Sequence, residues 1–119
     1  MPRYADCFVI PLPKKKLAAY KALATRAGKV WNEYGALDYV ECIGDDLIGF
    51  GTPFPKLAKL KKNETVVFSW ILYKSKAHRD SVNAKVMKDP RLAAMCDPKN
   101  SPFDMKRMTM GGFKTIVEY

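Results

Sequence analysis

The spacing of hydrophobic residues changes several times along the chain, and each change marks a predicted element. Between Pro13 and Gly35, apolar residues recur every three or four positions, at Leu17, Tyr20, Ala24, Ala27, Trp31 and Tyr34, with Lys and Arg between them. This spacing predicts an amphipathic helix that stops at Gly35. A second helix is predicted from Ser75, its N-cap, to about Lys88. Runs of aromatic and β-branched residues predict four strands. The predicted strands cover residues 4–10, 37–43, 65–73 and 113–118, the last after Gly111-Gly112. Asp89 is predicted to cap a short helical turn over residues 91–96.

The order of these elements predicts the fold. Strand, helix, strand, strand, helix, strand is the βαββαβ order of the ferredoxin-like arrangement, an α+β fold in which a four-stranded antiparallel sheet carries two main helices on one face. The 119 residues suffice for one domain, residues 1–119, with a single core. The connection over residues 44–64 contains several Gly and Pro residues and is too long for a tight hairpin, and connections of this length are often functional lids.

Both faces of the predicted strands are apolar. In the strand over residues 65–73, Val66, Phe68 and Trp70 share one face, while Val67 and Ile71 share the other. Helices cover one face of such a sheet, and the second face would alternate with polar residues if it met water. We therefore predict a homodimer joined through its sheet faces. The alternative is that residues 44–64 or 90–107 fold back over this face.

Charge and composition narrow the functional classes. The chain carries 21 Lys and Arg against 12 Asp and Glu, a net charge of +9 that could attract nucleic acid. The charge is spread over both halves of the chain, and its densest run is Lys14-Lys15-Lys16, which is typical of a solvated helix start. This spread argues against nucleic-acid binding, which stays as the alternative function.

The expected location is the cytoplasm. The longest apolar stretch, from Val66 to Tyr73, is far shorter than a membrane-spanning helix needs, and the N-terminal residues lack the apolar core of a signal peptide. Three cysteines, an odd number, suit a reducing compartment without a disulfide framework.

Two acidic residues stand out within apolar strands. Asp6 and Glu41 lie among aromatic and aliphatic neighbours, where a charge must be paired or change its protonation state. One interpretation is a carboxylate satisfied by Arg, Lys or backbone groups. The other is a carboxylic acid with a raised pKa that lines a ligand pocket.

The candidate catalytic residues are His78, Glu41 and Arg79. His78 is the only histidine and can face the sheet from its helix, either as a packing residue or as a general acid–base. An arginine near a carboxylate would orient it and balance its charge. The His and Cys spacings match no metal motif, so no metal site is predicted.

Aromatic residues predict where a ligand pocket would lie. Trp31, Tyr34, Tyr39 and Trp70 could line a cavity between the first helix and the sheet, with Asp6 as a further pocket residue, or could simply form core. No phosphate loop, dinucleotide fingerprint or GxSxG nucleophile motif is present, so the sequence predicts no cofactor and specifies no reaction.

Several segments in this order resemble the YbaA-like family of small bacterial proteins, a domain of unknown function. The segments are residues 6–11, 39–46, 67–70, 75–80 with Asn83, 89–91, and 102–104 through 106–108 to 111–113. The resemblance covers nearly the whole chain. It implies a place in the dimeric α/β-barrel superfamily, in which two ferredoxin-like sheets pack face to face, but it supplies no activity and no catalytic residues.

These observations leave three functions open. The first is a homodimer that binds or transforms a small organic molecule in a pocket between sheet and helices, without metal or nucleotide. The second is a nucleic-acid-binding protein, and the third is a purely structural or interaction protein. Whether the protein is an enzyme is left open.

Overall fold

The computed structural model describes residues 2–119 and has the predicted α+β fold, with one four-stranded antiparallel sheet in the order β2-β3-β1-β4. All three pairs of neighbouring strands are antiparallel, as the ferredoxin-like arrangement requires. The elements are β1 (Tyr4–Pro13), α1 (Leu17–Glu33), β2 (Asp38–Ile43), α2 (Phe54–Leu57), β3 (Glu64–Tyr73), α3 (Lys76–Met87), α4 (Pro90–Met95) and β4 (Thr109–Lys114).

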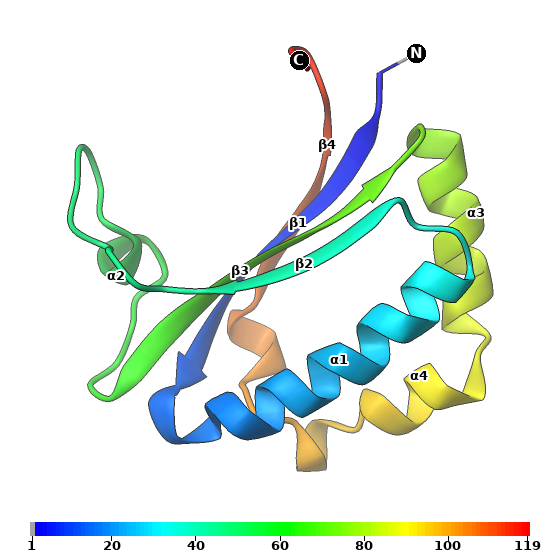
Figure 1. Cartoon of the computed structure of the whole chain (residues 1–119). Helices are drawn as coiled ribbons and strands as arrows, with labels where there is room; N and C mark the ends of the chain where they lie inside the picture. The colour runs from blue at the N-terminus through cyan, green and yellow to red at the C-terminus, as the bar shows by residue number, and fades with distance from the viewer. Residues whose placement is uncertain (1) are drawn as a thin grey trace.

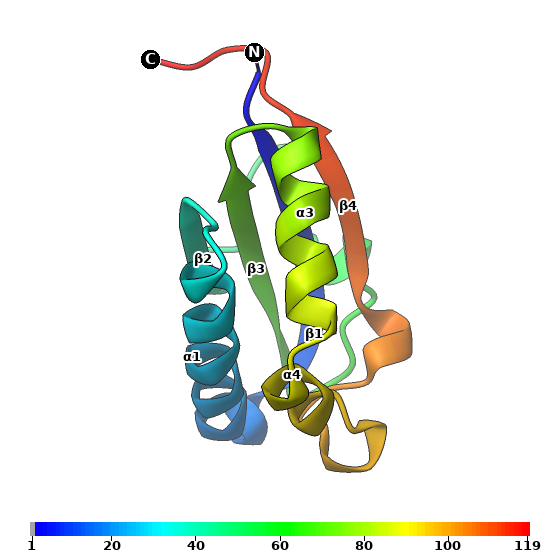
Figure 2. The same ribbon diagram turned by 90° about the vertical axis from the view of Figure 1, so that its right-hand side faces the viewer.

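The helices α1, α3 and α4 lie together on one side of the sheet (Figure 1). Seen from that side, α1 and α3 run beside each other over the strands, and α4 lies at their lower end (Figure 2). Val30 of α1 and Val82 and Val86 of α3 are buried against Ile71 and Tyr73 of β3. This packing forms the main core and fixes which residues of each strand face the helices.

The first helix and the first strand differ from the predicted bounds. Strand β1 continues through Pro11 to Pro13, and a 3-10 turn over Lys14–Lys16 precedes α1. Proline is tolerated here because β4 pairs with β1 only as far as Val9, so beyond that residue β1 is an edge strand. Ser75 and Asp89 cap α3 and α4 through their side chains, as predicted.

The prediction of the last strand was wrong. Strand β4 is Thr109–Lys114, so Gly111 and Gly112 lie inside it rather than before it. The reason is steric, since the ring of Tyr4 lies so close to Gly112 that a β-carbon there would overlap it. The glycine at residue 112 therefore marks a close approach between strands and not a turn.

The connection between β2 and β3 does not cover the helix side of the sheet. It contains α2, and Phe54 at its start packs edge-on against Phe68 with ring centroids 6.2 Å apart. Phe68 faces away from α1 and α3, so α2 lies at one end of the opposite face (Figure 1). Residues 90–107 belong to the helix side, where Leu92 and Phe103 pack against the two core clusters.

The face of the sheet opposite the helices is apolar and largely uncovered. Strand register places Trp70 and Leu72 of β3 on it, together with Cys7 of β1 and Val40 of β2. Phe68 is 38% exposed and Phe113 of β4 is 60% exposed on this face. We define the open face as Ala5, Cys7, Val9, Val40, Cys42, Phe68, Trp70, Leu72 and Phe113. No helix within residues 2–119 is both long and apolar enough to cross a membrane.

Candidate functional site

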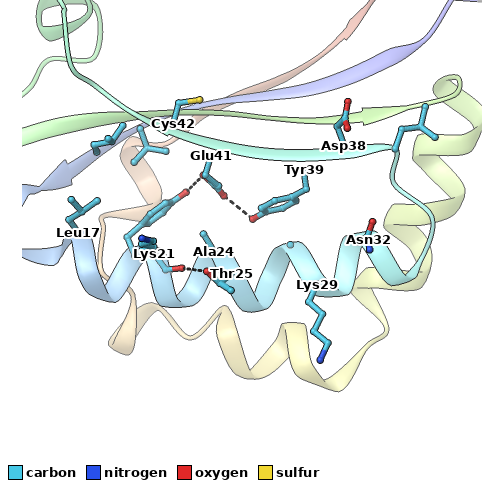
Figure 3. A pocket seen from close by; sticks show the side chains of 15 residues that line it. Leu17, Lys21, Ala24, Thr25, Lys29, Asn32, Asp38, Tyr39, Glu41 and Cys42 are labelled. Atoms are coloured by element: carbon cyan, nitrogen blue, oxygen red, sulfur yellow. Dashed lines mark hydrogen bonds between the residues drawn. The ribbon is translucent and has the colours of Figure 1, made fainter.

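Two hollows meet at Glu41 of β2. An inner cavity of about 260 Å³ lies between the sheet and the helices, and a larger groove of about 830 Å³ lies between α1 and the edge strand β2. Figure 3 shows the groove, with Glu41 and Tyr39 pointing from β2 toward α1. Glu41, Tyr39, Tyr20 and Ala24 line both hollows and so form the wall between them.

Two tyrosines hold the carboxylate of Glu41. The hydroxyl of Tyr20 donates to Oε1 at 2.7 Å, and the hydroxyl of Tyr39 donates to Oε2 at 2.8 Å (Figure 3). Burial and the adjacent Glu41 raise the pKa of both phenols, so both stay protonated as donors. Gly28 of α1 makes room for this arrangement, because a β-carbon there would lie 2.8 Å from Cδ1 of Tyr39.

Asp6 of β1 lies in the floor of the inner cavity and is 3% exposed. The amide nitrogen of Asn83 donates to its Oδ2 at 3.3 Å. The amide oxygen of Asn83 accepts from Trp31 Nε1 and from the hydroxyl of Tyr73, both at 3.1 Å. One amide from α3 therefore ties together a carboxylate and two aromatic donors from three other elements.

Arg79 supports Asp6 from outside the cavity. Its Nη1 lies 3.7 Å from Asp6 Oδ1, and its Nη2 donates to the hydroxyl of Tyr4 at 3.2 Å. The guanidinium also stacks over the Tyr4 ring at 4.8 Å from its centroid. Its buried Nε lies 3.2 Å from Asp80 Oδ1 but lacks the alignment of a hydrogen bond. Arg79 is thus a positioning group for Asp6.

Methionines and aromatic residues form a large part of the remaining cavity wall. The five methionines of the described chain all take part: Met87, Met95, Met105, Met108 and Met110. Thioether side chains are flexible and polarisable, so a wall made from them adapts to the shape of a ligand. The lining contains the carboxylates of Asp6 and Glu41 and no Lys, Arg or His.

The structure separates the residues that the sequence grouped as a site. Asp6, Glu41, Trp31 and Tyr39 meet around the inner cavity, where Trp31 and Tyr39 lie with ring centroids 6.0 Å apart. Trp70 belongs to the cavity floor as part of β3, but its side chain projects to the open face beside Phe68.

His78 lines neither hollow. Its Nδ1 accepts the Lys74 N–H at 3.0 Å, and its ring lies edge-on to Tyr73 at 6.0 Å. Its backbone N–H donates to Ser75 Oγ at the start of α3. These contacts give His78 a packing and helix-start role in this structure, away from Glu41.

Sequence reasoning missed Asn83 and the methionines as cavity residues. The signal for Asn83 was available in its spacing, since it follows Val82 and precedes Val86 on the buried side of α3. The methionines come from α3, α4, β4 and the turns between them, and only the fold brings them together. Among residues 2–119, no group of three or more His, Cys, Asp or Glu is arranged to hold a metal ion.

Comparisons with known proteins agree with this description. The model of the family described as "Protein of unknown function (DUF1428)" matches residues 3–105. The chain is 44% identical over 117 residues to the "Uncharacterized protein YbaA" of Escherichia coli K12, covering 98% of each chain, and equally similar to its counterpart in Shigella flexneri. The resemblance seen in the sequence is therefore confirmed.

A solved structure shows the same fold. It is the crystal structure of a dimeric ferredoxin-like protein from an uncultured marine organism, which the chain matches over 100% of both chains with a TM-score of 0.63 and 11% identity. At this identity the match establishes the fold alone.

Proposed function

Because the chain belongs to the DUF1428 family of proteins of unknown function, we propose from its own geometry that it binds a small organic molecule in the inner cavity. The observation that carries this proposal is the cavity itself, about 260 Å³, with apolar walls and a few converging polar groups. Ligand sites in proteins have this composition and are usually preformed.

The polar groups of the cavity are held in place before any ligand arrives. Tyr20 and Tyr39 fix Glu41, while Asn83 and Arg79 fix Asp6. Preorganised groups cost little conformational entropy when a ligand binds. The methionine wall supplies the adaptable part of the same site. Whether a bound molecule is also transformed depends on its chemistry, with Glu41 and Asp6 as the acid–base candidates that line the cavity.

A thermal-shift screen across classes of small organic molecules tests this proposal. Ligands that stabilise the protein should lose their effect in Ala27→Leu, which adds three carbons to a half-buried position in the cavity wall. The matched control is Ala22→Leu, on the exposed side of the same helix, and it should respond like the unmodified protein. Failure of every class to stabilise the protein, or equal stabilisation of both variants, would contradict binding in this cavity.

The proposal includes a homodimer joined through the open face, in a cytoplasmic protein. The open face is supported as an interface because its large apolar side chains lie in one continuous sheet surface. The three cysteines are unpaired, which suits a reducing compartment. The solved ferredoxin-like relative is itself described as dimeric.

A further inference from the structure

The charge of the inner cavity is opposite to the charge of the protein. The chain carries a net charge of +9, yet its 21 Lys and Arg side chains contribute none to the cavity lining, which holds two carboxylates. Lys21 and Lys29 line the outer groove, on the other side of the tyrosine wall, and not the cavity. An anionic ligand in the cavity would meet like charge without a cation to pair with.

Most of the donors of the cavity wall are already engaged. Tyr20 and Tyr39 donate to Glu41, and Trp31 donates to Asn83. The amide of Asn83 donates to Asp6, and Ser101 donates to a backbone carbonyl. A carboxylate offers about four lone-pair sites, of which each of these two uses only part. The cavity therefore offers acceptors to a ligand and few free donors.

Glu41 differs from Asp6 in how its charge is balanced. Asp6 has Arg79 as an ion-pair partner, whereas within residues 2–119 no Lys, Arg or His lies within 4 Å of Glu41. Its partners are two neutral hydroxyls. A half-buried carboxylate without a cation gains most from a ligand that brings one. The rings of Tyr20, Tyr39 and Trp31 around it favour the same charge through their π faces.

Resting on the proposed function, we infer that the ligand class is an apolar organic amine, whose ammonium group binds Glu41 and whose hydrocarbon body lies against the methionine and aromatic wall. The cavity volume of about 260 Å³ limits the body to roughly one ring and a short chain. The inference excludes nucleotides, phosphate esters and simple carboxylates from this cavity.

Three probes with one hydrocarbon body test the charge preference. They are 3-phenylpropylamine, 3-phenylpropan-1-ol and 3-phenylpropionate, titrated calorimetrically at pH 7 against the full chain. We expect the amine to bind at least about ten times more tightly than the alcohol, and the carboxylate to bind most weakly. In Glu41→Gln the advantage of the amine over the alcohol should vanish. The matched control Glu33→Gln removes the same charge from the exposed side of α1, and the amine should still bind more tightly than the alcohol in this variant.

A second variant guards against loss of structure in Glu41→Gln. Tyr39→Phe removes one of the two hydrogen bonds to the Glu41 carboxylate, so an ammonium group of the ligand should stabilise this carboxylate more strongly. Amine affinity should then be kept or rise several-fold while alcohol affinity stays within about twofold. A fall in amine affinity alone in Tyr39→Phe would overturn the role of Glu41.

The outcomes separate this inference from the proposed function. If the alcohol or the carboxylate binds as tightly as the amine and Ala27→Leu abolishes that binding, the cavity is a ligand site and the amine inference is wrong. If none of the three probes binds, but other compounds in the thermal-shift screen stabilise the protein and lose this effect in Ala27→Leu, the cavity is again a ligand site and the amine inference is again wrong. If nothing binds in that way, both proposals fail.

Discussion

Tyr4 of β1 and Gly112 of β4 are in such close contact that residue 112 has no room for a side chain. A β-carbon built on Gly112 would overlap the Tyr4 hydroxyl and lie 2.7 Å from Cε2 of the ring. The guanidinium of Arg79 lies over the same Tyr4 ring and 3.7 Å from Asp6. The absence of a side chain at Gly112 therefore helps to position a carboxylate of the cavity.

The first prediction is that Gly112→Ala destabilises the protein by about 1–3 kcal/mol, because the ring of Tyr4 has to move and the neighbouring side chains are overpacked. Urea unfolding followed by circular dichroism measures the change. Gly111→Ala is the matched control in the same strand, since a β-carbon there meets only Phe113 at an ordinary 3.7 Å. Adding Tyr4→Ala should restore part of the loss in Gly112→Ala. Equal losses in both glycine variants would show that the Tyr4 contact is not the cause.

The second prediction concerns the amide of Asn83. Asn83→Ala removes the acceptor shared by Trp31 and Tyr73 and the donor to Asp6, leaving buried polar groups unpaired. We expect a loss of about 1–3 kcal/mol or more in the free energy of unfolding, together with a changed Trp31 fluorescence. Asn32→Ala, an exposed asparagine near the end of α1, makes the same chemical change without these bonds and should alter stability little. An unchanged midpoint in Asn83→Ala would show that water replaces the amide without cost.

The third prediction is that the protein loses stability as the pH falls and that part of this loss is due to Asp89. Hydrogen bonds from the Arg91 side chain, from the Arg91 backbone N–H and from Tyr34 hold the pKa of Asp89 well below its usual range. Because the unfolded pKa is about 3.9, this carboxylate stabilises the fold at pH values above roughly 5, and that contribution is lost as the pH falls.

Asp89→Asn keeps an oxygen that can cap α4 but cannot form the ion pair with Arg91. The variant should be less stable at pH 7 and should lose less stability than the unmodified protein between pH 5 and pH 2. Melting temperatures measured between pH 5 and pH 2 show how steeply the stability of each protein falls with pH. Asp97→Asn, at the half-buried cap of the 3-10 turn over Pro98–Asn100, is the control for removing one charge. Parallel pH profiles for the unmodified protein and Asp89→Asn would rule out the linkage.

The sequence predicts the fold well where a signal is local. Hydrophobic spacing located α1 and β3, and the cap residues Ser75 and Asp89 located the starts of α3 and α4. The sequence did not predict β4 correctly, because Gly112 is required by a long-range contact with Tyr4 that no local pattern contains.

The site is predicted less well because it depends on which face of a strand meets the helices. Asp6, Glu41 and Tyr39 lie on the helix side and Trp70 on the other, although all four sit in similarly apolar runs. His78 has the spacing of a buried helix residue, yet Nδ1 is taken by the backbone of Lys74. The methionine wall depends on segments from Met87 to Met110 that only the packing of α4 and β4 brings together.

The fourth prediction concerns the open face, where the sheet register separates two neighbouring residues of β3. Ile71 is 3% exposed against the helices, while Trp70 projects to the opposite side with Phe68, which is 38% exposed. The connection with α2 covers only the end of that side near Phe54, so most of the face would meet water in a monomer. A stable interface buries about 800 Å² per partner, and two identical apolar faces related by a two-fold axis can cover each other.

We therefore expect light scattering at micromolar concentration to give twice the 13.5 kDa of one chain. Phe113→Asp should give a folded monomer, because residue 113 is 60% exposed on the open face and its replacement leaves the core intact. Leu17→Asp places the same charge at a 41% exposed position of α1, on the helix side, and should stay dimeric. Ile71→Asp should instead unfold the protein, since it buries an unpaired carboxylate in the core. A mass of one chain for the unmodified protein, or a dimer unaffected by Phe113→Asp, would show that the open face is covered in some other way.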